Sequence, residues 1–295
     1  MNIKIFTLII VLFATSMSLS AQSSMTFIKG RDGQNNVLIL LDSKAYPIDT
    51  LEGIQMRANY SYAFVRDTVS GYTETGTGTL EIGRNFTKYW DWKLFESDSL
   101  VRNGCVRSYS KVLDGAEVDQ ITLMEIFIHD LKSGKWACTG RVGTQDFLYE
   151  DEITDMVWEI SDSVSLVAGY NAVMATCSFR GRDYTAWFTP DIPVSAGPWK
   201  FSGLPGLILS VRDADGYYDF SLKGIYSTAG SIYMTDWLYL KTKRDKYMEA
   251  RNLMDTRPAV AKQRYWVNTD VEYQPSRKAL KQNIPLGNEY IEKDL

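Results

Sequence analysis

Residues 197–209 read GPWKFSGLPGLIL, and this stretch decides how the middle of the chain folds. Surface loops are polar and strands avoid proline, yet this stretch combines glycine and proline with large apolar residues. Its Gly-Leu-Pro-Gly sequence at 203–206 predicts a turn in which Pro205 has a fixed φ and Gly206 a positive one. We therefore predict a buried crossover, held by motif residues with a structural role: Gly197, Pro198, Gly203, Leu204, Pro205, Gly206, Leu207 and Ile208.

Alternating segments lie on both sides of this crossover. Residues 173–179 and 184–189 place apolar side chains at every second position, which is the period of a half-buried strand. Residues 207–211 and 217–225 form a second pair around the turn sequence Asp-Ala-Asp-Gly at 213–216. The crossover therefore joins two predicted hairpins.

The rest of the chain extends this β pattern and then changes. Weaker strand patterns lie at 58–65, 78–82, 121–128, 136–142 and 156–166. From Asp236 the apolar spacing becomes helical, with Thr235 or Asp236 as the N-cap and Pro258 beyond the end. We expect a mainly β fold, an antiparallel sheet of hairpins for which a curved open half-barrel is one arrangement, followed by a helical C-terminal segment.

The N-terminus predicts export. Lys4 precedes an apolar core at 5–13, and small residues follow up to Ala21. This is the pattern of a secretory signal peptide, and it is too short for a stable membrane span. We predict cleavage near Ala21 and a periplasmic or secreted protein that does not span a membrane. The expected organisation is a signal peptide at 1–21, a β domain at 22–235, and a helical or irregular segment at 236–295 packed on the same domain.

Net charge narrows the classes of partner, and the cysteine content limits the possible disulfides. The formal net charge is −4, which does not fit a nucleic-acid-binding protein. Residues 241–281 are rich in lysine and arginine, which predicts either a solvated helix face or a patch for phosphate or anionic lipid. Cys105, Cys138 and Cys177 allow one disulfide in an oxidising compartment, but the sequence does not select the pair.

The motif itself resembles a known family. GLPGLI stands at 203–208, and the elements FRGR at 179–182, AWF at 186–188, DIP at 191–193 and GP at 197–198 precede it. In these features, over about 169–225, the chain resembles the GLPGLI family of exported Bacteroidota proteins. The resemblance implies an envelope or secreted protein and no particular reaction. A cysteine that many relatives carry three residues after the glycine of a Gly-Tyr pair is absent after Gly169.

Few residues suggest catalysis or metal binding. His129 is the single histidine, and its place beside a predicted hairpin turn favours a surface residue. The acidic residues at 150–152 and Asp155 fit a solvated turn better than a calcium site. Asp213 and Asp215 fit a hairpin turn. We expect no metal and no cofactor, and no catalytic residue is selected; a distant pair of carboxylates for hydrolysis stays open.

The remaining candidates are contact residues. Trp187, Trp199 and Phe201 are candidate ligand or partner contacts, together with Arg180 and Arg182. Two readings of Arg180, Arg182, Lys200 and Arg212 stay open, a rim that binds carboxylate or phosphate and scattered charges at strand ends.

Three functions follow from these candidates. The first is a non-enzymatic exported protein that binds an apolar small molecule on the concave face of its sheet. The second is an envelope module that binds a protein partner through exposed Trp187, Trp199 and Phe201. The third is a hydrolase that uses two converging carboxylates.

Overall fold

The computed structural model describes residues 26–29, 37–40, 47–103, 123–267, 273–283 and 291–292. The predicted signal peptide and Cys105 lie outside these residues. No helix within the described ranges is both long and apolar enough to cross a membrane.

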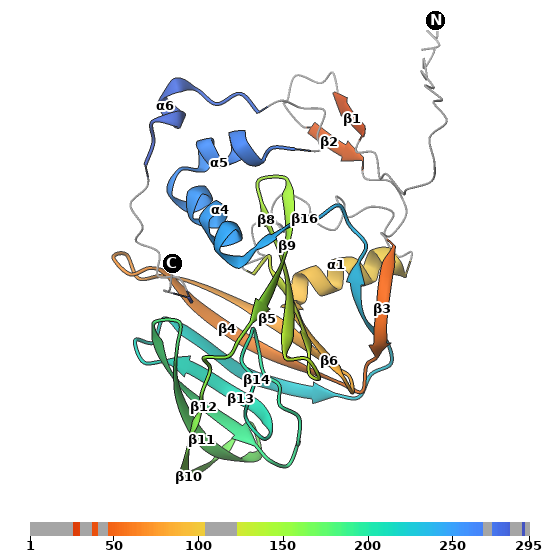
Figure 1. The fold of residues 1–295 in the computed structure, drawn as a ribbon, viewed down its shortest axis with the longest axis vertical. Coiled ribbons are helices and arrows are strands. Elements are labelled where there is room, and N and C mark those ends of the chain that lie inside the picture. Colours follow the sequence, from red (N-terminus) through yellow and green to blue (C-terminus); the bar gives the residue numbers. More distant parts are fainter. Residues whose placement is uncertain are drawn as a thin grey trace, which may run out of the picture.

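One large sheet dominates the structure (Figure 1), so the predicted mainly β, antiparallel fold is confirmed. It is open, and its neighbouring strands are antiparallel except for the last pair. In spatial order its twelve strands are β10 (Glu159–Val167), β11 (Tyr170–Phe179), β12 (Arg182–Thr189), β13 (Leu207–Asp213), β14 (Tyr218–Tyr226), β4 (Met56–Asp67), β5 (Tyr72–Ile82), β6 (Phe86–Asp91), β7 (Ile126–Asp130), β8 (Lys135–Val142), β9 (Gln145–Glu152) and β16 (Leu240–Lys243).

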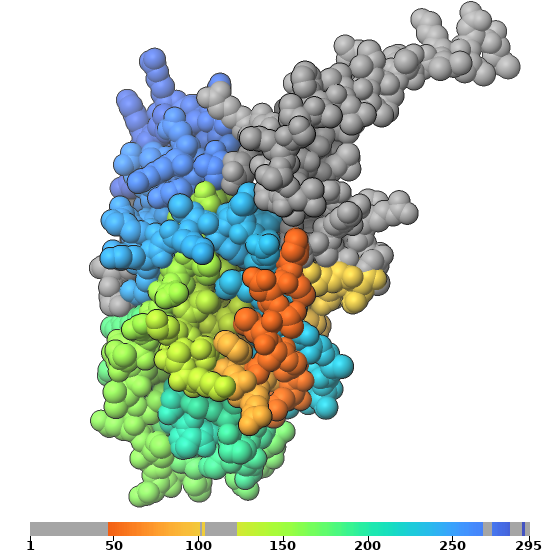
Figure 2. Space-filling view, turned by 45° about the vertical axis from the view of Figure 1, so that its right-hand side comes forward, coloured from red at the N-terminus to blue at the C-terminus, as the bar shows by residue number. Residues whose placement is uncertain are grey.

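Smaller elements surround this sheet. Two-stranded sheets are formed by β1 (Thr26–Lys29) with β2 (Val37–Leu40) and by β3 (Ile48–Gly53) with β15 (Ser231–Thr235). The helices are α1 (Trp92–Arg102), α4 (Arg244–Thr256), α5 (Pro258–Tyr265) and α6 (Arg277–Leu280). Helices α4 and α5 lie at the end of the molecule opposite β10 to β13, as Figures 1 and 2 show.

The helix predicted from residue 236 begins later, at Arg244, so its predicted N-cap is wrong. Residues 240–243 instead form β16, which pairs in parallel with Phe147–Glu150 of β9. Pairing with the edge of β9 satisfies the backbone hydrogen-bonding groups of residues 240–243. The spacing of apolar residues in the sequence does not reveal this pairing. Pro258 lies beyond α4 as predicted, but it also begins α5, where its missing N–H costs nothing.

The segment between β12 and β13 is the predicted buried crossover. Its Trp199, Phe201 and Leu204 side chains are at most 3% exposed. The Phe201 ring lies 4.9 Å from that of Tyr184 and 5.9 Å from that of Phe220, between two different strands of the sheet. Burying each such side chain contributes about 1.5–3 kcal/mol. The crossover therefore fills this face of the sheet with the chain's own aromatic rings.

The turn at 203–206 differs from the prediction in one respect. Gly203 has the positive φ, +93°, whereas Gly206 is not among the residues with positive φ. Gly206 is needed for another reason: a Cβ there would collide with the backbone carbonyl oxygen of Thr189. The prediction of a positive φ at Gly206 is therefore wrong, and close backbone approach explains the residue.

Candidate functional site

The aromatic candidates do not gather on the surface. Trp199 and Phe201 are core residues, 3% and 0% exposed, and Trp187 on β12 is half-buried. The exposed patch that the second hypothesis requires is therefore absent, because the crossover buries Trp199 and Phe201 against the sheet.

The charged candidates separate into two groups. Arg180 and Lys200 meet, whereas Arg182 pairs with Asp213 at 2.8 Å and Arg212 is exposed. The four residues therefore do not gather on one rim, and the two that come together are buried. In that pair, the partners are carboxylates of the same chain.

Arg180 and Lys200 belong to a buried ionic cluster. Arg180 donates to both carboxylate oxygens of Asp151, at 2.7 and 2.9 Å, and to Oε1 of Glu292 at 2.6 Å. Lys200 Nζ donates to the same two residues, at 2.8 and 2.9 Å. Arg244 at the start of α4 donates to Oε2 of Glu292 at 2.7 Å. Three cations therefore surround two carboxylates.

These carboxylates stay ionised. Burial alone would raise the pKa of Asp151, but the hydrogen bonds from Arg180 and the charge of Lys200 outweigh it and hold the pKa at about 2. For Glu292 the effect of burial is likewise outweighed, by Lys200, Arg180 and Arg244, so its pKa is lowered. A carboxylate held without its proton cannot act as a general acid. Asp151 and Glu292 converge as the hydrolase hypothesis requires, but this pair lacks a proton to donate.

Backbone strain accompanies this cluster. Among the non-glycine residues that the structure describes, Ala168, Arg180 and Trp199 have positive φ. Arg180 has φ +46°, and Trp199, which precedes Lys200, has φ +53°. Such conformations cost about 1–3 kcal/mol each and persist where the surroundings over-determine them. The ionic cluster and the packed Trp199 ring supply those surroundings.

Sequence reasoning missed Asp151 and Glu292. Asp151 lies 29 residues before Arg180 and Glu292 lies 112 residues after it. The prediction of a solvated turn at 150–152 is wrong, because these residues end strand β9. In the structure, strand alternation turns Asp151 inward and leaves Glu150 and Glu152 exposed.

His129 and the cysteines are buried. His129 is 8% exposed and its ring stacks on Trp136 at 4.0 Å, so the prediction of a surface histidine is wrong. The pairing of β7 with β8 places these two residues opposite each other. Cys138 and Cys177 are free thiols, and burial raises the pKa of each to about 12. Thiols of that pKa are poor nucleophiles at neutral pH.

No group of three or more histidine, cysteine, aspartate or glutamate side chains in the described ranges is arranged to hold a metal ion. The described part of the basic region at 241–281 is not a uniform solvated face either. Arg244 and Arg251 reach inward to Glu292 and Glu125, both of which are buried.

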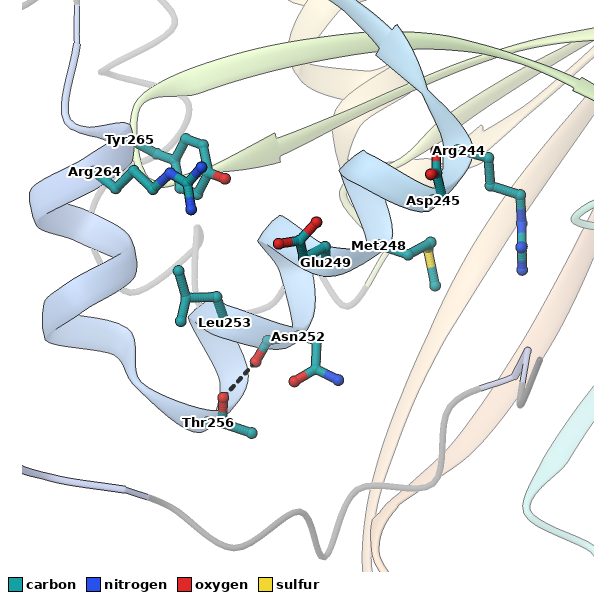
Figure 3. A pocket seen from close by; sticks show the side chains of 9 residues that line it. All are labelled: Arg244, Asp245, Met248, Glu249, Asn252, Leu253, Thr256, Arg264 and Tyr265. Carbon is teal, nitrogen blue, oxygen red and sulfur yellow. Dashed lines mark hydrogen bonds between the residues drawn. The ribbon is translucent and has the colours of Figure 1, made fainter. Parts of the chain in front are cut away.

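A pocket of about 560 Å³ lies beside α4 and α5. Figure 3 shows its side chains: Leu253 points from α4 toward α5, and Arg264 lies beside Tyr265. The residues that line it are Arg244, Asp245, Met248, Glu249, Asn252, Leu253, Thr256, Arg264 and Tyr265.

The pocket combines an apolar part with a polar rim. Met248, Leu253 and Tyr265 supply the apolar surface. On the rim, the guanidinium of Arg264 lies 5.4 Å from the centre of the Tyr265 ring, and Asn252 offers an amide. Glu249 is bound to Lys246 at 2.8 Å, and this hydrogen bond lowers the pKa of Glu249. Such a pocket suits a molecule with an apolar body and a polar end.

Comparison with known proteins adds a family match at the motif. Residues 176–210 match a Bacteroidota-associated family described as "Protein of unknown function (Porph_ging)". The Porph_ging match thus spans the end of β11, all of β12, the crossover and the start of β13. No curated protein matches the chain.

Two solved structures are similar in part. "Structure of PNGF-II in P21 space group" is 13% identical with a TM-score of 0.46, and covers 68% of this chain and 33% of that one. "Structure of PNGF-II in C2 space group" is 14% identical with a TM-score of 0.45, and covers 68% and 32%. The chain spans about a third of the length of these structures.

Proposed function

We propose that this is an exported, periplasmic or secreted member of the GLPGLI family that binds a small amphipathic molecule without transforming it. The carrying observation is the pocket of about 560 Å³ beside α4 and α5, with Met248, Leu253 and Tyr265 on its walls. Its volume lies within the range of about 300–1,000 Å³ typical of small-molecule sites. The signal-peptide pattern and the ordered motif elements around 203–208 support export and the family.

The ligand would lie beside α4 and α5 and not on the face of the sheet. The crossover covers that face with Trp199, Phe201 and Leu204, which leave the core closely packed. Beside α4 and α5, an apolar body would contact Leu253 and Tyr265. An anionic end would lie near Arg264, which is exposed, contacts the Tyr265 ring and contributes to the lowered pKa of Glu249.

Binding of two fluorescent probes by the mature protein tests this proposal. One probe is a dansyl-labelled fatty acid, which is anionic, and the other is N-phenylnaphthylamine, which is uncharged. Leu253→Trp fills the pocket and should weaken both probes by about tenfold or more. Arg264→Gln should weaken the dansyl fatty acid alone, because it removes a cation and leaves the apolar wall in place.

The matched control is Leu238→Trp, which adds the same ring at a side chain that is 67% exposed and outside the pocket. Probe affinities of this variant should equal those of the unmodified protein. Equal affinities in folded Leu253→Trp and Leu238→Trp would overturn the site, and the failure of the unmodified protein to bind either probe would overturn the function.

A further inference from the structure

The first strand of the large sheet has an open edge. β10 pairs with β11 on one side, and no strand of the described residues pairs with its other side. In Figures 1 and 2 the green to teal strands, β10 among them, form the end of the molecule away from α4 and α5. An edge of this kind presents unpaired backbone donors and acceptors.

This edge is unusually apolar for a surface strand. Val157, Ile160, Val164 and Leu166 are 70, 52, 75 and 72% exposed. Scattered aliphatic residues on a surface need no explanation, but three in β10 and a fourth, Val157, two residues before it form a patch. Along the same strand, each exposed aliphatic side chain raises the risk of unselective pairing with other strands.

The charged residues in the sequence around this patch have a single sign. No lysine or arginine occurs between Arg141 and Arg180, whereas this interval contains seven acidic residues. Of these, Asp155, Glu159 and Asp162 are exposed beside the aliphatic residues. A strand that pairs with this acidic edge needs basic side chains. Opposite charges that face each other stabilise a strand pair, whereas like charges destabilise it.

A bulge limits which part of the edge can pair. The register of β10 with β11 shifts between Ile160 and Val164, so the intervening residues bulge. The Ser161 hydroxyl accepts from the backbone N–H of Ser163 at 3.1 Å and donates to the carbonyl of Met174 at 3.3 Å. Regular pairing is therefore available along 164–167, with Asp162 next to it.

We propose that β10 is a docking edge for an extended segment of another protein in which aliphatic and basic residues alternate. The segment pairs along 164–167, its aliphatic side chains cover Val164 and Leu166, and its basic side chains lie beside Asp162 and Glu159. A second copy of this chain fits less well, because two β10 strands would bring carboxylates together without a cation. This site is independent of the pocket beside α4 and α5.

The test uses two synthetic eight-residue peptides, one of alternating valine and lysine and one of alternating valine and glutamate. Hydrogen exchange of the mature protein is measured with each, and affinity by fluorescence anisotropy. The valine–lysine peptide should slow exchange of the amides at 164–167 and bind at least about tenfold more tightly than the valine–glutamate peptide. Equal binding of both peptides, or protection elsewhere only, would overturn the proposal.

Two double variants test whether the peptide binds at the edge of β10 or is attracted only by the overall negative charge of the protein. Glu159→Gln with Asp162→Asn should reduce the preference for the lysine peptide at least about fivefold. Val164→Lys with Leu166→Lys should abolish protection at 164–167, while the control Val69→Lys with Leu238→Lys, both exposed elsewhere, leaves it unchanged. Circular dichroism verifies that each variant is folded. Concentration-dependent protection of 164–167 without peptide would instead identify a second copy as the occupant and overturn the proposal.

Discussion

At the residue scale, the backbone of the motif is fixed by a close approach between Gly206 and Thr189. A Cβ at Gly206 would overlap the carbonyl oxygen of Thr189 and approach Phe188 Cδ2 at 3.1 Å. The neighbouring register of β12 with β13 shifts between Trp187 and Phe188, so the two strands are irregular where the crossover enters β13. Because Gly206 has no side chain, the crossover can pack closely against β12.

Gly206→Ala should lower the free energy of unfolding by about 1–3 kcal/mol, because Thr189 must move to admit the methyl group. Urea unfolding of the two proteins measures the difference. The matched control is Gly53→Ala on β3, where the nearest atom to the added Cβ is the Gly230 carbonyl oxygen at 3.9 Å. Its change should stay below about 0.5 kcal/mol. Similar values for both variants would contradict the close-approach explanation.

At the scale of elements, the C-terminal segment is tied to three others through one residue. Glu292 binds Arg180 after β11, Lys200 in the crossover and Arg244 at the start of α4. The backbone carbonyl of Ile291 also accepts from the Tyr184 hydroxyl at 2.9 Å. Glu292 therefore joins the motif region to the start of α4, and Asp151 adds a longer contact to Arg244 at 3.9 Å.

Glu292→Gln should lower the free energy of unfolding by about 3–5 kcal/mol, since it leaves three cations with Asp151 as their remaining counter-charge in the cluster. The variant keeps the shape of the side chain, so the loss reports charge. Glu152→Gln is the control, because Glu152 is exposed and pairs with Lys135 only at 3.5 Å on the surface. We expect little change in its urea midpoint. A small loss in Glu292→Gln would show that the cluster is not what holds the C-terminal segment.

At the scale of the whole molecule, stability should fall with acid in two separate ranges. Burial lowers the pKa of His129 from 6.5 to about 4, although Asp130 partly opposes this. His129 therefore binds a proton below about pH 6.5 in the unfolded chain but only below about pH 4 in the folded chain. Stability is lost as the pH falls through this range. Asp151, whose pKa is lowered to about 2, contributes stability above pH 3.8 that is lost toward pH 2.

His129→Phe should remove the first of these losses while keeping a ring stacked on Trp136. Between pH 7 and pH 4 the unfolding free energy of the unmodified protein should fall by on the order of 3 kcal/mol more than that of the variant. Urea unfolding at intervals of pH measures both curves. Parallel curves would mean that His129 takes up its proton in the folded protein at an ordinary pKa.

Some of this molecule could be predicted from local sequence patterns. Alternation at 173–179 and 184–189 located β11 and β12, and the turn at 213–216 located the hairpin of β13 and β14. The apolar residues of GPWKFSGLPGLIL indicated a buried crossover, and Trp199 and Phe201 are buried. These features depend on side-chain period, proline and glycine geometry and burial, which act over a few neighbouring residues.

Other features were decided by which distant segments meet. In the cluster of Asp151, Arg180, Lys200 and Glu292, directly bonded residues are up to 112 positions apart, and no local pattern marks them as partners. The burial of His129 follows from its pairing opposite Trp136, and the exposure of Val164 and Leu166 follows from the place of β10 at a sheet edge. The sequence by itself determined β11 to β14, the turn between β13 and β14 and the buried crossover, because those depend on local conformation. Strand order and long-range charge pairing, which set the ionic cluster, the pocket and the open edge, were decided only when the tertiary structure brought distant residues together.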